Sequence, residues 1–123
     1  MIIGAEREVS EAPALQEIGD GVFVHEQPPG GWCLNNAGLV VSNGRSFLID
    51  TAATRARALR LRAAVEQVVP EGPDVVVNTH FHGDHVFGNS LFTPRAMVVA
   101  HELTRADIAE AGLAMCRLWP DVD

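Results

Sequence analysis

The sequence has few cysteines: only Cys33 and Cys116 occur in 123 residues. Two thiols so far apart in the chain give neither the disulfide framework of a small secreted domain nor a close metal-binding pair. We interpret both as buried or partly buried thiols without a role in chemistry.

Long apolar runs are also missing. No segment approaches the roughly 20 apolar residues that cross a bilayer. The first residues, MIIGAEREVSEAPAL, lack the basic region and apolar stretch of a secretory signal. No repeat, low-complexity segment or linker divides the chain. We therefore expect a cytoplasmic protein without a membrane partner.

Positive charge is scarce, with 9 basic against 16 acidic residues and a net charge of −7. Such a balance repels phosphate backbones and argues against nucleic acid as a partner. The apolar fraction of 47% is ample for a core. The length suits one small domain over residues 1–123, with a flexible segment at 1–14.

One short segment concentrates metal-binding side chains. His80, His82, Asp84 and His85 form an H-x-H-x-D-H array directly after a β-branched run at 75–77, which is typical of a buried strand. His80 and His82 are two residues apart, so on extended backbone they point to the same side and can bind one cation together. The array indicates a metal site at the end of a strand.

A turn after His82 completes the predicted site. We expect Gly83 to form it, because glycine adopts positive φ at little cost. Asp84 and His85 would then face a second position close to the first. Imidazole and carboxylate groups suit zinc, and also iron, manganese or cobalt. Two such ions can share a water, lower its pKa and present hydroxide to a substrate, with Asp84 as ligand and catalytic residue.

This array resembles the signature of the metallo-β-lactamase superfamily. The resemblance extends to residues 36–51, NAGLVVSNGRSFLIDT, which look like paired strands of that family ending in Asp-Thr. It also includes residues 95–108, RAMVVAHELTRADI, which look like its next strand and helix. The resemblance implies an α/β (α+β) fold, the N-terminal half of an αββα sandwich, over residues 22–123.

By this resemblance, His80 and His82 match first-site ligands, and Asp84 and His85 match second-site ligands. The zinc lactamases with a cysteine ligand usually carry arginine in place of His85, so the pattern is more similar to glyoxalase II, lactonases and general hydrolases. Complete members supply another first-site histidine, a bridging aspartate and a late histidine downstream. Nothing in residues 86–123 resembles those motifs.

Half of such a domain would expose the apolar face of its sheet, which soluble monomers avoid. We therefore expect a homodimer or larger assembly, or a second chain that completes the fold. Two functions remain open. The first is a metal-dependent hydrolase, with two zinc ions expected and iron or manganese as alternatives, in which metal-bound hydroxide attacks a small-molecule ester, thioester, lactone or amide. The alternative is a truncated, catalytically incomplete assembly subunit that binds metal weakly or not at all.

Other polar residues have less specific signals. His25 and His101 are interpreted as structural histidines near strand ends. Asp50 either supports the metal site or caps the next helix. The aromatic side chains are expected in the core, with pocket lining as the alternative; they are Trp32, Phe81 and Phe87.

The predicted order is strands first, then alternating helix and strand. Strands are expected at 15–18, 22–27, 39–42, 46–49, 75–77 and 97–100, and helices at 54–69, 84–90 and 102–118. Asn43-Gly44 predicts a hairpin turn. The first helix carries four arginines, which we interpret as a solvated face, with an anion site as the alternative; they are Arg55, Arg57, Arg60 and Arg62.

Overall fold

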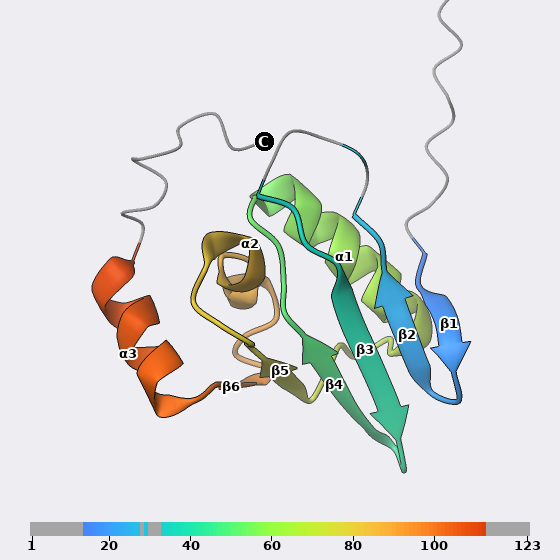
Figure 1. The fold of residues 1–123 in the computed structure, drawn as a ribbon. Helices are drawn as coiled ribbons and strands as arrows, with labels where there is room; N and C mark the ends of the chain where they lie inside the picture. Colours follow the sequence, from blue (N-terminus) through green and yellow to red (C-terminus); the bar gives the residue numbers. More distant parts are fainter. Residues whose placement is uncertain (1–13, 28, 30–32, 113–123) are drawn as a thin grey trace, which may run out of the picture.

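The computed structural model describes residues 14–27, 29 and 33–112. Six strands form one mixed sheet in sequence order (Figure 1). They are β1 (Gln16–Gly19), β2 (Val22–His25), β3 (Ala37–Ser42), β4 (Arg45–Ile49), β5 (Val75–Val77) and β6 (Met97–Val99). The helices are α1 (Arg55–Val68), α2 (Gly83–Val86), α3 (Glu102–Ala111) and the 3₁₀ helix η1 (Asn89–Leu91).

Two kinds of strand pairing follow from the connections. β1 to β4 pair antiparallel, and the turn between β3 and β4 is made by Asn43 and Gly44 at φ 49° and 72°. This confirms the predicted hairpin, since these positions require left-handed backbone. β4, β5 and β6 pair in parallel because α1 and the α2–η1 segment carry the chain back between them.

The core lies between the sheet and α1. Leu39, Leu48 and Val76 extend from adjacent strands, and Leu61 and Val65 meet them from the helix; all five are fully buried. α1 begins where Thr54 accepts a hydrogen bond from the Arg57 amide, so Thr54, and not Asp50, is its cap. The apolar stripe of α1 was predicted from its three- and four-residue spacing.

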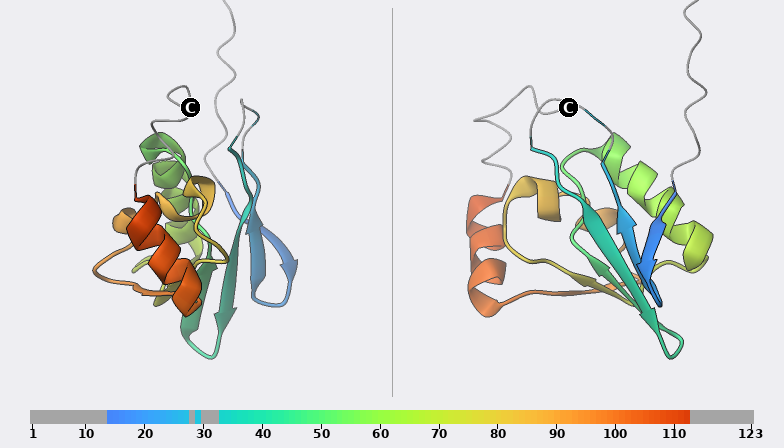
Figure 2. Two further views of the ribbon diagram at one scale, coloured as in Figure 1. Left: turned by 60° about the vertical axis from the view of Figure 1, so that its left-hand side comes forward. Right: turned by 45° about the vertical axis from the view of Figure 1, so that its right-hand side comes forward.

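The opposite face of the sheet carries a continuous apolar row. Cross-strand pairing places Val22, Val40, Phe47, Val75 and Met97 side by side over five strands. Val22, Phe47 and Met97 remain 36%, 37% and 63% exposed. In the part of the chain that the structure describes, no helix covers this row (Figure 2). The fold therefore corresponds to one sheet with helices on a single side.

The end of the chain departs from the predicted helix over 102–118. α3 ends at Ala111, because Gly112 adopts φ 49° and ψ −129°, which no helix accommodates. Residues 113–118 lie outside the described part, as do Trp32 and Cys116. The predicted short helix at 84–90 is two pieces, α2 and η1. No helix within the described ranges is long and apolar enough to cross a membrane.

Candidate metal centre

The predicted ligands gather where β5 ends and α2 begins. The His80 ring lies 4.7 Å from the His82 ring and 3.9 Å from the His85 ring, measured between centroids. His85 Nε2 lies 3.3 Å from Asp84 Oδ2. Three imidazoles and one carboxylate thus lie close together, and their binding of a metal stays a prediction.

The backbone brings these side chains together without the turn that we expected. His82 is extended, with φ −60° and ψ 146°, and α2 starts at the next residue. Gly83 is helical and is not among the residues with positive φ, so the predicted reason for glycine is wrong. A Cβ at Gly83 would instead collide with the Phe87 ring. Close packing one turn along α2 is therefore what requires glycine at this position.

Asp50 orients His85 from the end of β4. Its carboxylate accepts hydrogen bonds from the Thr79 amide at 2.8 Å and the Thr79 hydroxyl at 2.7 Å. Oδ2 also lies 2.8 Å from His85 Nδ1. Asp50 is only 4% exposed and has φ 62°, a left-handed conformation that aspartate tolerates better than most residues. Asp50 therefore contacts the predicted ligand His85 and does not cap α1, and its support of a bound metal stays a prediction.

A buried polar network holds the backbone of α2 against the sheet. The His85 carbonyl accepts hydrogen bonds from the Thr51 amide at 2.8 Å, the Thr51 hydroxyl at 3.0 Å and Asn78 Nδ2 at 3.2 Å. Asn78 and Asn89 exchange two further bonds, at 3.1 and 2.6 Å. These contacts fix the position of His85, because a fully bonded buried network has one low-energy arrangement.

The surroundings of His80 favour the neutral form, which binds metals. Burial lowers its pKa, and the nearby His85 and His82 lower it further, against a weaker opposing effect of Asp50 and Asp84. A neutral imidazole has a free lone pair, which a metal ligand requires. The Thr79 hydroxyl lies 3.0 Å from His80 Nδ1, which leaves Nε2 as the nitrogen available to a cation.

The chemical type of the donor atoms suits a divalent cation. For residues 14–27, 29 and 33–112, no three His, Cys, Asp or Glu side chains are arranged as a ready-made metal site. The available donors are nevertheless those that zinc prefers, namely histidine nitrogen and carboxylate oxygen. His85 Nδ1 is bound to a carboxylate, as in many metal-ligating histidines, so its other nitrogen faces Asp84 within the cluster.

The first prediction concerns Asp50→Asn. Asparagine has the same size and tolerates positive φ, but its amide nitrogen cannot accept the hydrogen bonds that Thr79 and His85 direct at the carboxylate. We expect metal affinity to fall about 10- to 100-fold, the usual effect of losing such a partner. Competition with a chromogenic chelator measures it. Asp74→Asn is the control, since Asp74 contacts Ser46 and two arginines instead; an equal loss in both variants would contradict the role of Asp50.

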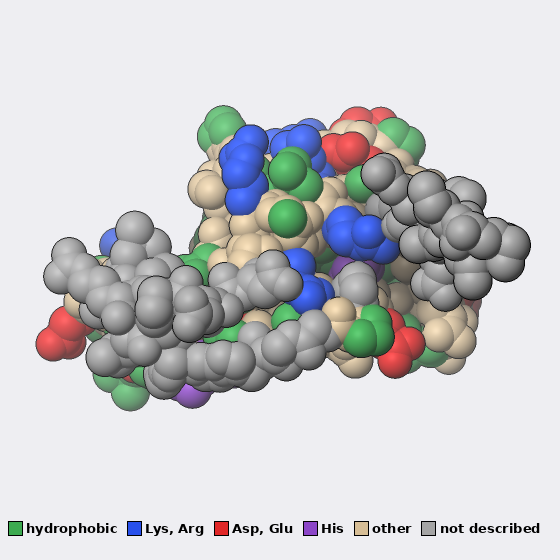
Figure 3. Space-filling view, turned by 90° about the horizontal axis from the view of Figure 1, so that it is seen from above, with side chains coloured by type: hydrophobic (Ala, Val, Ile, Leu, Met, Phe, Trp, Pro, Cys, Tyr) green, Lys and Arg blue, Asp and Glu red, His purple; other side chains and the backbone are tan. Residues whose placement is uncertain are grey.

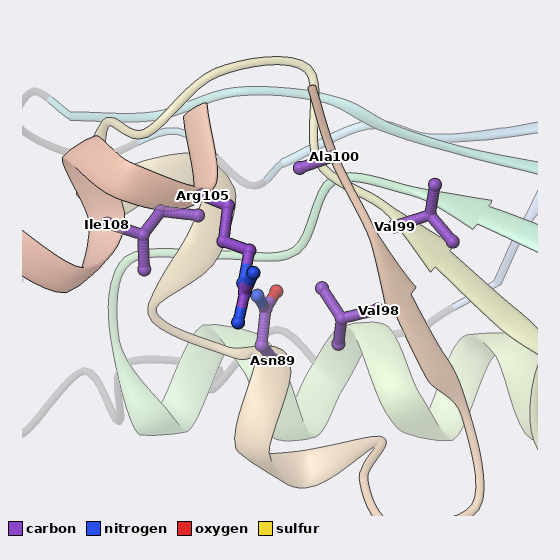
Figure 4. Close-up of a pocket in the computed structure, with 6 residues that line it drawn as sticks. All are labelled: Asn89, Val98, Val99, Ala100, Arg105 and Ile108. Atoms are coloured by element: carbon purple, nitrogen blue, oxygen red, sulfur yellow. The ribbon is translucent and has the colours of Figure 1, made fainter. Parts of the chain in front are cut away.

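Two hollows flank α3. Phe81 and Phe87 are partly buried and line a pocket of about 300 Å³ together with Ile108. A second pocket of about 500 Å³ lies between α3 and β6, where Arg105 and Asn89 extend toward one another (Figure 4). The aromatic pair therefore combines packing with pocket lining, the two alternatives that its sequence left open.

The other predicted histidines have different surroundings. His101 is exposed and caps α3, accepting a hydrogen bond from the Leu103 amide at 3.2 Å. His25 is buried at the end of β2. Thr79, Asn78 and Asn89 belong to the site and were not identified from the sequence. The sequence offered one signal for them, namely that polar residues directly follow the buried run 75–77.

Comparison with known proteins agrees with this architecture. Residues 30–115 match the family model described as the metallo-beta-lactamase superfamily. The chain is 41% identical over 75 residues to "Metallo-beta-lactamase domain-containing protein 1" of Mus musculus, covering 60% of this chain and 29% of that protein.

Solved structures give the same fold. A metallo-beta-lactamase from Erythrobacter litoralis superposes with a TM-score of 0.65 at 25% identity, over 80% of this chain and 45% of its own. One from Hirschia baltica gives 0.64 at 23% identity, over 80% and 47%. The chain thus spans less than half the length of these relatives. It belongs to the metallo-β-lactamase superfamily, whose members are generally metal-dependent hydrolases, and contains part of that fold.

Proposed function

We propose that this chain supplies the metal-binding part of a hydrolase active site. His80 and His82 would hold one zinc ion, and Asp84 and His85 a second, with iron or manganese as substitutes. The observation that supports this most is the cluster of three imidazoles and Asp84, with His85 oriented by the buried Asp50. The substrate class is a small-molecule ester, thioester, lactone or amide.

Each residue has a defined task in this proposal. Bound cations supply Lewis acidity and lower the pKa of water. Asp84 would orient the attacking oxygen, because its carboxylate already lies beside His85 and is largely buried. Asp50 holds His85 through Nδ1, and the Thr51–Asn78–Asn89 network keeps α2 in place. The Phe81–Phe87 pocket, whose Phe81 ring contacts the His82 ring, offers an apolar surface for a substrate.

Hydrolysis of chromogenic esters, thioesters and lactones by the zinc-loaded chain tests the proposal. We expect turnover that a chelator abolishes and added zinc restores. The second candidate, an incomplete assembly subunit, is favoured by the small share of its relatives that this chain spans. Stoichiometric zinc binding without turnover of any of these substrates would favour that candidate.

The uncovered sheet face leads to a second proposal, that two copies of the chain pair through it. The row Val22–Val40–Phe47–Val75–Met97 is apolar throughout and has no charged member, so a twofold axis would place like surfaces together. Exposed apolar surface of this extent is unusual in soluble monomers. A second copy would thus replace the missing layer of the sandwich.

Phe47→Glu tests the pairing. Phe47 is central in the row, and a carboxylate there would lose its hydration in the interface, which costs several kcal/mol. We expect the dissociation constant of the dimer to rise at least about 100-fold, measured by sedimentation velocity. Ala106→Glu adds the same charge at an exposed position of α3, on the helix side of the sheet, and should leave assembly unchanged. A monomeric wild-type chain with native NMR dispersion would refute the dimer.

A further inference from the structure

The larger of the two pockets that flank α3, called here the β6–α3 pocket, lies at the edge of the sheet (Figure 4). β6 is the last strand in the sheet order, so the pocket opens beside a strand with one neighbour in the described part of the chain. Its volume of about 500 Å³ is typical of ligand pockets in proteins. None of the four proposed metal ligands lines it. The pocket can therefore be considered apart from the metal centre.

The walls of the β6–α3 pocket are mostly apolar. Val98, Val99 and Ala100 belong to β6 and the residue after it, and Ile108 belongs to α3. Val98 and Val99 are 38% and 43% exposed, although valine is usually buried. Figure 4 shows Val98 pointing into the space between the strand and the helix. An aliphatic group bound there would cover apolar surface that now faces water.

Two polar side chains extend toward one another across the pocket, Arg105 from α3 and Asn89 from η1 (Figure 4). Asn89 and Asn78 exchange two hydrogen bonds through their amides, which uses one of the two hydrogens on Asn89 Nδ2. The guanidinium of Arg105 has neither a hydrogen-bond nor an ion-pair partner in the part of the chain that the structure describes. The pocket thus presents open N–H donors and a positive charge beside its apolar walls.

A single carboxylate matches these donors. The guanidinium fork of arginine binds both oxygens of a carboxylate at once. The remaining hydrogen of Asn89 Nδ2 offers a further donor on the opposite wall. A group with two negative charges fits less well, because α3 carries three acidic residues and only this one arginine.

We propose that the β6–α3 pocket binds an aliphatic monocarboxylate, the anion of a carboxylic acid with an unbranched hydrocarbon chain. The carboxylate would lie between Arg105 and Asn89, and the chain against Val98 and Ile108. Apolar walls with a few convergent polar groups are the usual composition of a small-molecule site, in which the polar groups fix the orientation of the ligand.

The probe is hexanoate, titrated into the full chain at constant ionic strength with chloride as balance. NMR follows the methyl signals of Val98 and Ile108. Acetate keeps the carboxylate but lacks the chain, and hexanol keeps the chain but lacks the charge. We expect saturable shifts with hexanoate and affinity at least about tenfold weaker for each of the other two compounds, because each loses one of the two interactions.

Arg105→Gln tests the role of the charge. It should weaken hexanoate binding at least about tenfold and leave hexanol binding unchanged. Arg105 is exposed, so its replacement should not disturb the fold. Arg55→Gln is the control, because it removes the same charge from an exposed position of α1. Most basic side chains visible from above lie on the side of the molecule that carries α1 (Figure 3), and this variant should bind hexanoate like the wild type.

Four results would overturn the proposal. Shifts that do not saturate would mean that no site exists. Binding that disappears when a chelator is added would place the carboxylate on the metal centre. Hexanol bound as tightly as hexanoate would mean an apolar hollow that does not recognise charge. Equal weakening by Arg105→Gln and Arg55→Gln would mean attraction to the overall charge of the chain. The proposed hydrolase activity does not enter this test, so either proposal can fail alone.

Discussion

Replacing His82 with alanine is expected to reduce zinc affinity more than roughly 100-fold. Loss of a group that hydrogen-bonds a metal ligand can cost that much, and here the proposed ligand itself is removed. His82 is exposed and its ring makes edge contacts with His80 and Phe81. Its removal takes a nitrogen donor from the cluster but no packed side chain from the core. Metal binding should therefore fall sharply while the fold remains, as judged by circular dichroism and by competition with a zinc dye.

His101→Ala is the matched control for this experiment. It removes the same imidazole from an exposed position, where the ring caps α3 and lies outside the proposed ligand set. Zinc affinity should stay as in the wild type, with a small loss of stability from the missing cap. Asp84→Ala should behave like His82→Ala. Unchanged zinc affinity in either ligand variant would refute the assignment of the array.

Leu61→Ala is expected to lower the free energy of unfolding by about 2–5 kcal/mol. Leu61 is fully buried where α1 meets Leu39, Leu48 and Val76 of the sheet. Truncation leaves a cavity at the centre of a core that, within the described residues, has one layer of helix, so few neighbours can move in to fill it. Urea unfolding at fixed protein concentration, with an unchanged m-value, measures the loss.

Leu103→Ala makes the same chemical change on α3, where the side chain is 67% exposed. Its effect should stay within about 0.5 kcal/mol. Similar losses in the two variants would mean that the layer of α1 on the sheet does not carry the stability of this chain.

Much of the fold follows from local sequence signals. The β-branched run 75–77 is a buried strand, Asn43-Gly44 is a hairpin turn, and the spacing of Leu61 and Val65 marks the buried stripe of α1. Each of these features depends on residues only a few positions apart, so it can be predicted from the sequence. The H-x-H-x-D-H array is equally local, which is why its side chains could be expected to meet.

The supporting parts of the site depend on contacts that the sequence pattern does not reveal. Asp50 reaches Thr79 and His85 across 29 and 35 residues, and Thr51 reaches the His85 carbonyl across 34. The contacts of Asp50 and Thr51 become visible only when the strand order places the ends of β4 and β5 together. The role of Gly83 was misjudged for a different reason, since packing against Phe87, one turn further along the chain, decides it and not its own φ.

The most direct test of the metal centre is the metal content of the purified chain, measured by inductively coupled plasma mass spectrometry. The proposed ligand pairs, His80 with His82 and Asp84 with His85, predict about two zinc ions per chain in the assembled protein. They also predict that His82→Ala loses at least one of these ions and that His101→Ala loses none. A content near zero in the wild-type chain, even after incubation with zinc, would contradict the account.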